Sequence, residues 1–514
     1  MVNVMKLYSY RQIQDIEAAT IAETGTTTGA INAELGAQAA EAVAEMLADC
    51  ECRPVVFAGP GRCGAIAIAT AQGLATRGLH PTVYFFNIRG TSAQPDAVAA
   101  RDAYLAACGS EGFEEVRGNF SMPELGSRDL VVDGLFGSEV EGPLGGAYQA
   151  LVRRINESGA RIVAIDMPSG LPADGAPGLI NRNIIHADLT LAIGMPRLAF
   201  FSAENAELVG QWQTLDAGYS REAAARMQAG YYLIERKQVR RILTPRHPDS
   251  SKADYGSLVI FAGSYGMMGA ALLATRSALR SGCGKVTCHA PRCGYLVMQT
   301  AAPEALFETS PDDDVCITDI ELRRDYNAVA IGPGIGTDDV TIDALEAFLK
   351  VANANSRPVV LDADALNCIA LRPTLLDYIP VMSVITPHAG EFDRMFGMQP
   401  GPDARLAKAI EVAMFHKIVI VLKGHHTAVV RPDGKVCFNP TGTAALATAG
   451  TGDVLTGLIG GFMAQGISPE LAASAGVFVH GLAGRIAENT HGSYGVTAGD
   501  VADNIGRAIY SLMK

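Results

Sequence analysis

The sequence lacks the features that mark nucleic-acid-binding and membrane proteins. It has no long run of Lys and Arg, and acidic residues outnumber basic ones by 54 to 41, for a formal net charge of −13. Because phosphate backbones are held by clustered positive charge, this balance argues against nucleic acid as a partner. No apolar run reaches the roughly 20 residues that span a bilayer, and the N-terminal stretch has no signal-peptide core. We therefore expect a cytoplasmic protein with neither a nucleic-acid nor a membrane partner.

Cysteine is present, but its spacing argues against two kinds of site. The ten cysteines are scattered, Cys50 and Cys52 are the closest pair, and no CxxC pair occurs. Zinc sites usually contain closely spaced pairs, and disulfide frameworks belong to short secreted chains. We expect neither kind of site here, and we expect the thiols to be reduced.

Short continuous apolar runs are abundant, and most of them end in a polar or glycine-rich turn. Runs that are apolar on both faces are typical of strands buried in a parallel sheet, and the Ala- and Leu-rich stretches between them are typical of helices. This alternation predicts α/β layers, in which ligands bind at the carboxyl ends of the strands. The runs cover residues 53–61, 81–87, 129–137, 161–170 and 188–194 in the first half, and residues 257–264, 328–336, 358–366, 383–391 and 417–424 in the second.

A chain of 514 residues exceeds what one hydrophobic core usually organises, so we expect at least two domains. The most charged segment, residues 218–256, contains no sheet-like run and separates the two groups of runs. We therefore predict one domain at residues 1–225 and a second at residues 226–514.

The segment ATAGTGDVLTGLIGG (447–461) is the strongest sign of chemistry. Gly450 and Gly452 allow a tight turn that brings backbone N–H groups close to an anion, and a helix is predicted to begin near Asp453. Helix N-termini attract phosphate, and a carboxylate there is placed to accept a proton from a substrate hydroxyl during phosphoryl transfer. The alternative is that Asp453 only caps the helix, a role for which Asp is favoured.

Four other strand ends carry polar or glycine-rich motifs. KGHHT (423–427) offers a Lys, a backbone turn and a hydroxyl group to a nucleotide, and GPGIG (332–336) lets a ligand lie against bare backbone. TPHAGE (386–391) places a His and a Glu where we expect a ligand role. The two Asp of DADALN (362–367) either hold Mg²⁺ through water or cap the helix that follows.

Residues 240–514 resemble the ADP/ATP-dependent NAD(P)H-hydrate dehydratases, a family of the ribokinase-like superfamily. The matching motifs run in order from KADYGSLVIFAGSYGMMGA through IGPGIG, LDADALN, ITPHAGEF and VLKGHHT to NPTGTAALATAGTGDVLTG. The resemblance implies a ribokinase-like three-layer sandwich. It implies that the hydrated nicotinamide nucleotide is contacted by Ala270, Gly334, His388 and Asp453. It also implies that the adenine nucleotide is held by Lys423, Gly424, His425, His426, Thr427 and Gly452.

The implied reaction suits these residues. A hydrated NADH or NADPH carries a hydroxyl group at C6 of its reduced ring, and phosphate is a far better leaving group than hydroxide. We expect Asp453 to remove the hydroxyl proton while ADP or ATP donates a phosphoryl group. Mg²⁺ and the amides of Gly450–Gly452 are expected to stabilise the developing charge. Elimination of phosphate then restores the double bond of the ring.

Residues 1–219 resemble the NAD(P)H-hydrate epimerases, which are often fused in front of the dehydratase in bacteria. The resemblance implies a Rossmann-like three-layer sandwich for this half. The matching parts are the strand, turn and helix at 55–69, VVDGLFGSEVEGPLGGAY (131–148), IDMPSGLPADG (165–175) and IIHADLTLAIG (184–194).

The site implied for the first half binds K⁺ and the substrate. Asp133 and Ser169 resemble K⁺ ligands, and oxygen donors at strand ends suit a hard cation. Asp166 is implied to contact the substrate beside the reacting ring, which makes it a second candidate catalytic residue. The alternative for Asp133 and Asp166 is an Asp that starts a turn or caps a helix. The substrate diphosphate is implied to lie against Gly137, Ser138, Glu139, Val140, Glu141, Gly142 and Pro143.

The glycine loop of the first half departs from the family pattern. The family reads GxGNNGGDG where this chain reads GPGRCGAIA (59–67), so Arg62 and Cys63 replace two Asn and Ile66 replaces an Asp. A thiol is a poor ligand for K⁺, whereas a guanidinium is suited to grip phosphate with two hydrogen bonds. Pro172 also stands where Asp is usual. We expect nucleotide binding to be retained and epimerisation to be weakened.

Two alternatives stay open. In the first alternative, the second half is a vitamin-precursor or sugar kinase of the same superfamily, which would use a similar glycine loop. In the second alternative, the first half is a non-catalytic binding or oligomerisation module, and the altered loop is the evidence for it. We expect a homo-oligomer that acts on small molecules. The sequence does not decide between ADP and ATP, or between NADH and NADPH.

Overall fold

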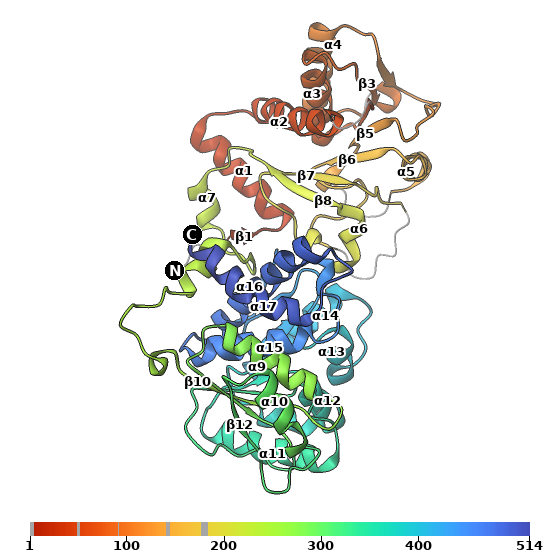
Figure 1. The fold of residues 1–514 in the computed structure, drawn as a ribbon. Helices are drawn as coiled ribbons and strands as arrows, with labels where there is room; N and C mark the ends of the chain where they lie inside the picture. The colour runs from red at the N-terminus through yellow and green to blue at the C-terminus, as the bar shows by residue number, and fades with distance from the viewer. Residues whose placement is uncertain (1–4, 49–51, 91, 140–143, 176–182) are drawn as a thin grey trace. The chain divides into compact units, whose positions relative to one another are not determined.

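The computed structural model describes residues 5–48, 52–90, 92–139, 144–175 and 183–514 (Figure 1). Its chain forms two compact units, of which one is Leu7–Ala229 and the other is Gly230–Lys514 together with residues 5 and 6. The division at 229/230 lies near the predicted boundary at 225/226. That the two parts are independent domains stays a prediction.

The first unit contains one parallel sheet. Its strands pair in the order β4-β3-β2-β5-β6-β7-β8, and all neighbouring pairs are parallel. The strands are β2 (Arg53–Ala58), β3 (Thr82–Phe86), β4 (Phe113–Val116), β5 (Asp129–Gly134), β6 (Arg161–Ile165), β7 (Leu189–Ile193) and β8 (Gln211–Leu215). The helices are α1 (Tyr10–Thr24), α2 (Thr28–Ala48), α3 (Arg62–Thr76), α4 (Pro95–Cys108), α5 (Gly146–Glu157), α6 (Ala206–Val209) and α7 (Arg221–Arg226).

Two apolar clusters, one on each face of this sheet, form the core of the first unit. One cluster contains buried residues of α2, α3 and α4, and the other contains buried residues of α5. Neighbouring residues of β2 divide between them, since Val56 belongs to the first cluster and Val55 and Phe57 to the second. This is the burial pattern that a parallel strand between two helical layers requires. The predicted Rossmann-like three-layer sandwich is therefore confirmed.

Helices α2 and α3 pack closely because small residues face each other. A Cβ atom on Gly36 would overlap the side chain of Ala69, and one on Gly73 would lie 2.7 Å from the Cβ atom of Ala40. Real Cβ atoms essentially never come so close, so glycine at these two positions sets the distance between the helices.

The second unit contains an eleven-stranded sheet in the order β1-β9-β18-β17-β16-β15-β14-β13-β10-β11-β12. The run from β16 to β12 is parallel, and β17 is antiparallel to both of its neighbours. The strands are β1 (Met5–Leu7), β9 (Tyr231–Leu233), β10 (Ser257–Phe261), β11 (Lys285–His289), β12 (Leu306–Glu308), β13 (Ala328–Ile331), β14 (Val360–Leu361), β15 (Val384–Ile385), β16 (Val419–Leu422), β17 (Ala428–Val430) and β18 (Val436–Phe438). The sequence did not predict that β1 joins this sheet.

Helices lie on both faces of the second sheet. They are α8 (Arg236–Ile242), α9 (Met268–Arg280), α10 (Tyr295–Ala301), α11 (Asp339–Ala354), α12 (Asp364–Leu371), α13 (Ala389–Phe396), α14 (Pro402–His416), α15 (Thr451–Ala464), α16 (Pro469–His491) and α17 (Ala498–Met513). On one face, α9, α15, α16 and α17 share an apolar cluster with Leu258 and Ile260 of β10 (Figure 1). On the other face, the ring of Phe261 lies 6.1 Å from that of Phe348 on α11. The predicted ribokinase-like three-layer sandwich is therefore confirmed.

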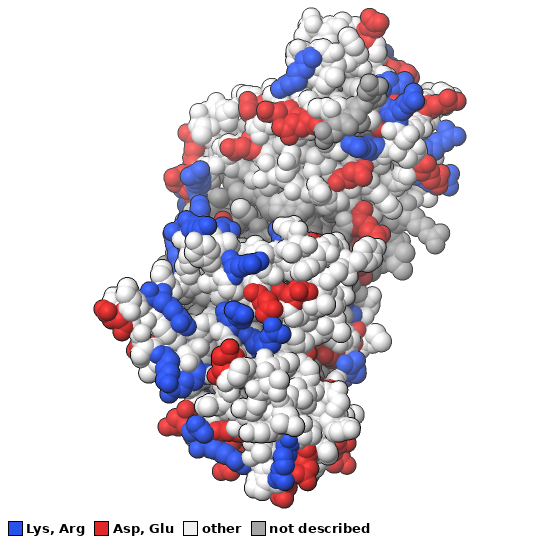
Figure 2. Space-filling model, in the orientation of Figure 1, with Lys and Arg blue, Asp and Glu red and all other residues white. Residues whose placement is uncertain are grey.

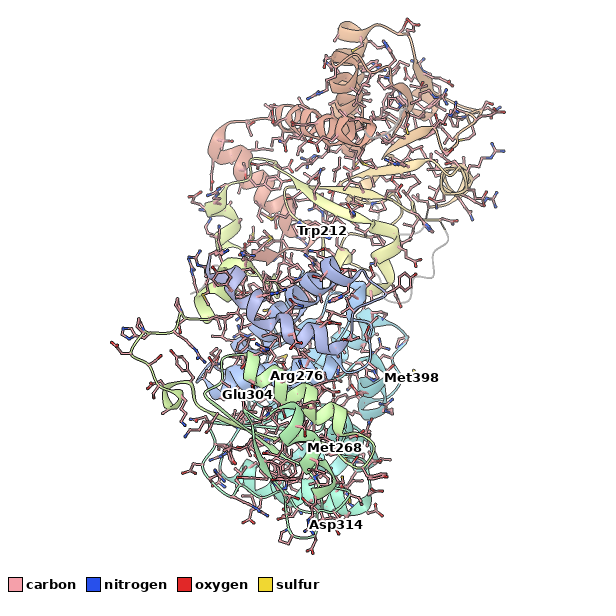
Figure 3. The ribbon with its side chains drawn as sticks, in the orientation of Figure 1. Trp212, Met268, Arg276, Glu304, Asp314 and Met398 are labelled. Atoms are coloured by element: carbon pink, nitrogen blue, oxygen red, sulfur yellow. The ribbon has the colours of Figure 1, made fainter. Side chains whose placement is uncertain are left out.

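Helix α15 lies at the centre of this unit's core. It is buried at every position from Val454 to Ala464. Gly457 lets it approach α9, because a Cβ atom there would overlap the carbonyl oxygen of Ala274. Helix α9 begins at Met268 and carries Arg276 (Figure 3). The Met268 side chain is buried, and Arg276 pairs with Asp503 of α17 at 2.7 Å. The start of α15 is thus held by packing along the rest of the helix.

The surface and the thiols complete the comparison with the sequence. Lys and Arg are interspersed with Asp and Glu over the face shown in Figure 2. Among the described residues, no helix combines the length and the apolar character needed to cross a membrane. Cys52 is disulfide-bonded, so the expectation of reduced thiols is wrong at that residue, whereas Cys63 and Cys368 are free.

Candidate active sites

Polar side chains from neighbouring strand ends meet in the second unit. Asp362 follows β14, Lys423 follows β16, and Asp453 lies in the first turn of α15. The Lys423 ammonium donates to the Asp362 carboxylate at 2.9 Å and lies 3.6 Å from the carboxylate of Glu391. Because β14, β15 and β16 are parallel neighbours, their carboxyl ends share one edge of the sheet. The structure therefore gathers the predicted motifs into one cluster.

Asp453 has the proton affinity of a general base. Burial raises its pKa to about 7, the Asp362 carboxylate adds to the rise, and the Lys423 ammonium opposes it. Asp364 and Glu391 add further, smaller rises. A carboxylate with a pKa near the working pH is suited to accept a proton during a reaction. The N-cap of α15 is Gly450, and no side chain caps this helix, so the alternative that Asp453 is only a cap is wrong.

The N-terminus of α15 is open to an anion because of its two glycines. Gly450 adopts φ +88°, the left-handed region that favours glycine, and a Cβ atom on it would lie 2.6 Å from Leu273. A Cβ atom on Gly452 would lie 3.4 Å from the Lys423 ammonium nitrogen. The bare backbone thus leaves N–H groups and an ammonium facing the same space, an arrangement that favours phosphate.

A cavity of about 400 Å³ opens beside this helix start. Its volume lies within the range of about 300–1,000 Å³ that small-molecule sites occupy. Five of the six predicted nucleotide-binding residues line it, namely Lys423, Gly424, His425, Thr427 and Gly452. His426 does not line it. Burial lowers the pKa of His426 to about 4, and its Nδ1 atom lies 3.4 Å from the carbonyl oxygen of Asn439.

His480 also lines this cavity, and sequence reasoning missed it. It projects from α16, and its Nε2 atom lies 2.9 Å from the carbonyl oxygen of Thr451 in the first turn of α15. A carbonyl only accepts, so Nε2 carries the proton. Burial lowers the pKa of His480 to about 4, which keeps the ring neutral. The available signal was a His inside an apolar helix, which by itself is weak.

Ala270 and Gly334, both predicted to contact the substrate, are neighbours. Gly334 follows β13 with φ +65°, and a Cβ atom on it would lie 3.2 Å from that of Ala270 on α9. The hydroxyl of Ser264, after β10, donates to the carbonyl of Gly334 at 2.8 Å. The loops after β10 and β13 are thus joined. Contact between these residues and a substrate stays a prediction.

His388 is the N-cap of α13. The Nδ1 atom of its ring accepts from the backbone N–H groups of Gly390 at 3.0 Å and Glu391 at 3.3 Å. The backbone N–H of His388 donates to the Glu391 carboxylate at 2.8 Å. The neutral ring therefore carries its proton on Nε2, and its side chain is 53% exposed. His388 caps α13 in this structure, its Nε2 atom lies 3.4 Å from the Glu391 carboxylate, and its contact with a substrate stays a prediction.

The two Asp of DADALN do not cap α12. Its N-cap is Ala363, with no side-chain cap, and φ +50° puts that residue in a strained backbone region. Asp362 instead accepts from Lys423, and Asp364 accepts from the Gly336 N–H at 3.0 Å. The described residues also contain no group of three or more His, Cys, Asp or Glu able to hold a metal ion. The capping alternative is therefore wrong for α12, and a role for the two Asp in holding Mg²⁺ through water stays a prediction.

In the first unit, Asp133 and Ser169 lie together at the ends of β5 and β6. The Ser169 hydroxyl donates to one carboxylate oxygen of Asp133 at 2.7 Å, and the Ser169 N–H donates to the other at 2.8 Å. The N–H groups of Leu135 and Phe136 donate to Asp133 and Ser169 respectively. Burial raises the pKa of Asp133 to about 6. The two predicted K⁺ ligands thus bond to each other.

Asp166 is held in place by a buried arginine. It adopts φ +67°, and its carboxylate accepts from the Ser138 N–H at 2.9 Å and from the Arg197 guanidinium at 2.5 Å. Arg197 also donates to the Ser138 hydroxyl at 3.1 Å. Glycine at position 137 allows its backbone to lie close to Asp166, since a Cβ atom there would lie 3.2 Å from that side chain. Glu139 lines the same space, whereas Val140, Glu141, Gly142 and Pro143 lie outside the described residues.

Arg62, in the altered glycine loop, pairs with two side chains of the first unit. Its guanidinium donates to the Glu17 carboxylate at 2.5 Å and to the Asn32 side-chain oxygen at 2.9 Å. The Tyr219 hydroxyl donates to the same Glu17 carboxylate at 2.9 Å. The cavity that Arg62, Glu17 and Tyr219 share with Asp166 is only about 20 Å³, room for about one water molecule. Arg62 is therefore paired within the protein through Nε and Nη1, whereas its buried Nη2 atom has no hydrogen-bond partner among the described residues.

Comparison with known proteins covers both units. A family model described as NAD(P)H-hydrate dehydratase matches residues 258–507, and one described as YjeF-related protein N-terminus matches residues 32–199. The bifunctional NAD(P)H-hydrate repair enzyme Nnr of Thermofilum pendens is 32% identical over 474 residues, which cover 89% of this chain and 88% of that protein. The enzyme of the same name from Moorella thermoacetica is 33% identical over 466 residues, which cover 88% and 86%. The chain belongs to the family of bifunctional NAD(P)H-hydrate repair enzymes.

One similar solved structure is the ADP/ATP-dependent NAD(P)H-hydrate dehydratase of Bacillus subtilis, co-crystallised with ATP and Mg²⁺. It is 34% identical, covers 55% of this chain and 98% of its own, and has a TM-score of 0.49. Membership of the repair-enzyme family favours hydrate repair over the small-molecule kinase alternative for the second unit.

The K⁺ site implied by the resemblance is altered in this chain. The oxygens of Asp133 and Ser169 are engaged with each other and with backbone N–H groups. Cys63 supplies a thiol that lies 3.5 Å from the carbonyl oxygen of Ile165, and burial raises the pKa of that thiol. A neutral thiol is a poor ligand for a hard cation. Cys63 therefore offers K⁺ no oxygen, and coordination of K⁺ by Asp133 and Ser169 stays a prediction.

Sequence reasoning missed three residues of this site. Arg197 follows the last apolar run of the first half, as IGMPR, and its position at a strand end was the available signal. Glu17 and Tyr219 lie far from the glycine loop in the sequence, and nothing local marks either residue as a partner of Arg62.

Proposed function

We propose that this chain repairs hydrated NADH and NADPH in two steps. The second unit dehydrates the S epimer of the hydrate with ADP or ATP as phosphoryl donor, and the first unit interconverts the R and S epimers. Membership of the bifunctional repair-enzyme family supports both activities. The observation that carries the dehydratase assignment is Asp453, a half-buried carboxylate with a pKa of about 7 at a helix N-terminus beside a cavity of ligand size.

The first step of the dehydration is phosphoryl transfer. Asp453 accepts the proton of the C6 hydroxyl group, and the hydroxyl oxygen attacks the terminal phosphorus atom of ADP. The bond from that phosphorus to the AMP oxygen breaks, which gives AMP and a phosphorylated hydrate. Lys423 and the N–H groups at the start of α15 offer positive charge to the phosphoryl oxygens as negative charge develops on them.

The second step is elimination. The ring nitrogen donates its lone pair as the bond between C6 and the phosphate oxygen breaks, and phosphate leaves. Loss of a proton from C5 then restores the double bond and gives NADH or NADPH. ATP serves equally in this scheme and leaves as ADP.

Mg²⁺ supplies charge neutralisation at phosphoryl groups when it is bound. Since the described residues contain no group of three or more His, Cys, Asp or Glu able to hold a metal ion, we propose that Mg²⁺ arrives on the nucleotide phosphates and keeps water as most of its other ligands. No step of this scheme requires a protein ligand to the ion.

For the first unit, we propose slow epimerisation. Asp166, fixed by Arg197, is the group that would contact the substrate beside its reacting ring. The pair of Arg62 and Glu17 occupies the space next to it, so substrate enters only when that pair separates. We also propose that the chain is a homo-oligomer in the cytoplasm; both remain predictions from the sequence.

The test of the dehydratase assignment is a product balance. The purified chain is incubated with the S hydrate of NADH, ADP and Mg²⁺, and the products are separated by chromatography. The proposal expects one AMP and one phosphate for each NADH formed, and no NADH without nucleotide. Transfer of phosphate to a thiazole or pyrimidine alcohol, with no recovery of NADH, would support the kinase alternative instead.

A further inference from the structure

Asp362 has no role in the reaction described so far, yet it is the most enclosed charged group of the second site. Its residue is 1% exposed. One carboxylate oxygen accepts from the Lys423 ammonium at 2.9 Å, and the other accepts from the Thr456 hydroxyl at 2.5 Å. Thr456 lies on α15, one turn after Gly452, and also contacts the Gly452 carbonyl at 3.3 Å. Asp362 therefore ties the ends of β14 and β16 to the first turns of α15.

The backbone around Asp362 is fixed as well. Its N–H donates to the carbonyl of Ile331 at 3.1 Å, and Gly332 lies so close to its carbonyl that a Cβ atom would overlap it. The next residue, Ala363, has φ +50°. A strained residue persists only where its surroundings hold it, and such residues cluster at functional sites. The carboxylate therefore has little freedom to move away from Lys423.

We propose that Asp362 is a positioning residue for the dehydration. Through its contact with Lys423 it holds the ammonium over the N-terminus of α15, where the phosphoryl group is transferred. Through its negative charge it keeps the neighbouring Asp453 basic enough to take the hydroxyl proton. The inference rests on the proposed dehydratase function and adds a role for a residue outside the substrate and nucleotide contacts predicted from the sequence.

The charges that face Asp453 make the second effect measurable. They are the carboxylates of Asp362, Asp364 and Glu391, which raise its pKa, and the ammonium of Lys423, which lowers it. Asp362 is the strongest of these neighbours. Removal of its charge, with Lys423 still near Glu391, must lower the pKa of Asp453. Activity that depends on ionised Asp453 would then begin at lower pH.

The test compares three variants of the full chain with the wild type. Asp362→Asn removes the charge and keeps the shape. Thr456→Val removes the hydroxyl that holds Asp362 and keeps the charge. Asp343→Asn is the matched control, an exposed carboxylate on α11 that pairs with Arg372. For each, kcat and KM for the S hydrate with ADP and Mg²⁺ are measured from acid to alkaline pH.

For Asp362→Asn, we expect kcat to fall on the order of 100-fold, as for a misplaced catalytic group. We expect little change in KM, and we expect the acid limb of the pH profile of kcat to move to lower pH. For Thr456→Val, we expect a smaller fall in kcat and an unmoved acid limb. The control should match the wild type. If Asp362→Asn does not fold, Thr456→Val decides: a lower kcat at unchanged KM supports the proposal, and wild-type kcat overturns it.

The proposal is overturned if Asp362→Asn leaves the acid limb of the pH profile of kcat where it is in the wild type. This holds both when kcat is unchanged and when kcat falls together with the stability of the protein, because a merely structural residue gives such results. Failure of the proposed function looks different. In that case the wild type forms no NADH with ADP, and this inference fails with it.

Discussion

The substitution Asp453→Asn should abolish dehydration and at the same time stabilise the protein. Asn keeps the size of the side chain and removes both its charge and its basicity. Loss of a general base typically lowers the rate by about 10²–10⁴-fold. Stabilisation is expected because partial burial, together with the nearby carboxylates of Asp362, Asp364 and Glu391, disfavours the charge of the wild-type carboxylate.

The size of the stabilisation follows from the two pKa values. The ordinary pKa of an Asp is 3.8, and that of Asp453 in the folded protein is about 7. Between these values the folded state binds more protons than the unfolded state, so the free energy of unfolding falls as pH rises. At 1.36 kcal/mol for each pKa unit between the folded and unfolded states, the free energy of unfolding lost above pH 7 is at most about 4 kcal/mol, and none is lost below about pH 4. Partial exposure of the side chain and the unmet hydrogen bonds of a buried amide reduce this value.

Denaturant unfolding of wild type and Asp453→Asn at about pH 8 and about pH 4 measures the effect. The variant should be more stable at the higher pH, by up to about 4 kcal/mol, and should match the wild type at the lower pH. Asp343→Asn serves as the control at both. A stability difference that does not change with pH would refute the raised pKa of Asp453, and wild-type turnover by the variant would refute its role as the base.

Three further predictions concern other parts of the molecule. Arg62→Asn should increase the rate of R to S interconversion, because it empties the space beside Asp166. Arg77→Asn, at the end of the same helix, is the control and should leave the rate unchanged. If Arg62→Asn also leaves the rate unchanged, the proposal that Arg62 blocks the site beside Asp166 is wrong. Gly36→Ala should destabilise the first unit by about 1–3 kcal/mol through overpacking against α3, as read from denaturant midpoints, unless the two helices are free to separate. His388→Ala should cost about 1 kcal/mol through loss of the cap of α13, and it tests the predicted substrate contact separately, because that contact requires a rise in KM for the hydrate.

The carboxyl ends of the strands in the second unit were the most predictable part of the site. Lys423, His388 and Asp453 are far apart in the sequence, but each follows an apolar run and a turn. A parallel sheet brings such ends to one edge, so their proximity could be predicted from the pattern alone. What the pattern could not give was their pairing. Side-chain geometry determines that Lys423 donates to Asp362 and that the Nδ1 atom of His388 accepts from the backbone of its own helix.

The site of the first unit was less predictable for a physical reason. The loss of two Asn from the glycine loop was visible in the sequence, and it indicated a weak K⁺ site. The consequence depends on Glu17 and Tyr219, which approach Arg62 only in the folded unit. The expectation that Arg62 grips phosphate is unsupported for this conformation, because its guanidinium already has an anionic partner.

Strand β1 shows the same limit for the fold. Its three residues, Met5–Leu7, carry too short a pattern to be recognised as a strand, and the strand lies at the edge of the sheet that the second half builds. Pairing over so long a separation is determined by the tertiary structure and not by local propensity.

The most direct test of the account is the fate of a mixture of the R and S hydrates of NADH with the full chain, Mg²⁺ and K⁺, with and without ADP. The account predicts that ADP is required for NADH to form, that the S epimer disappears first, and that the R epimer follows more slowly. NADH formation that does not need a nucleotide, or no NADH at all, would contradict it.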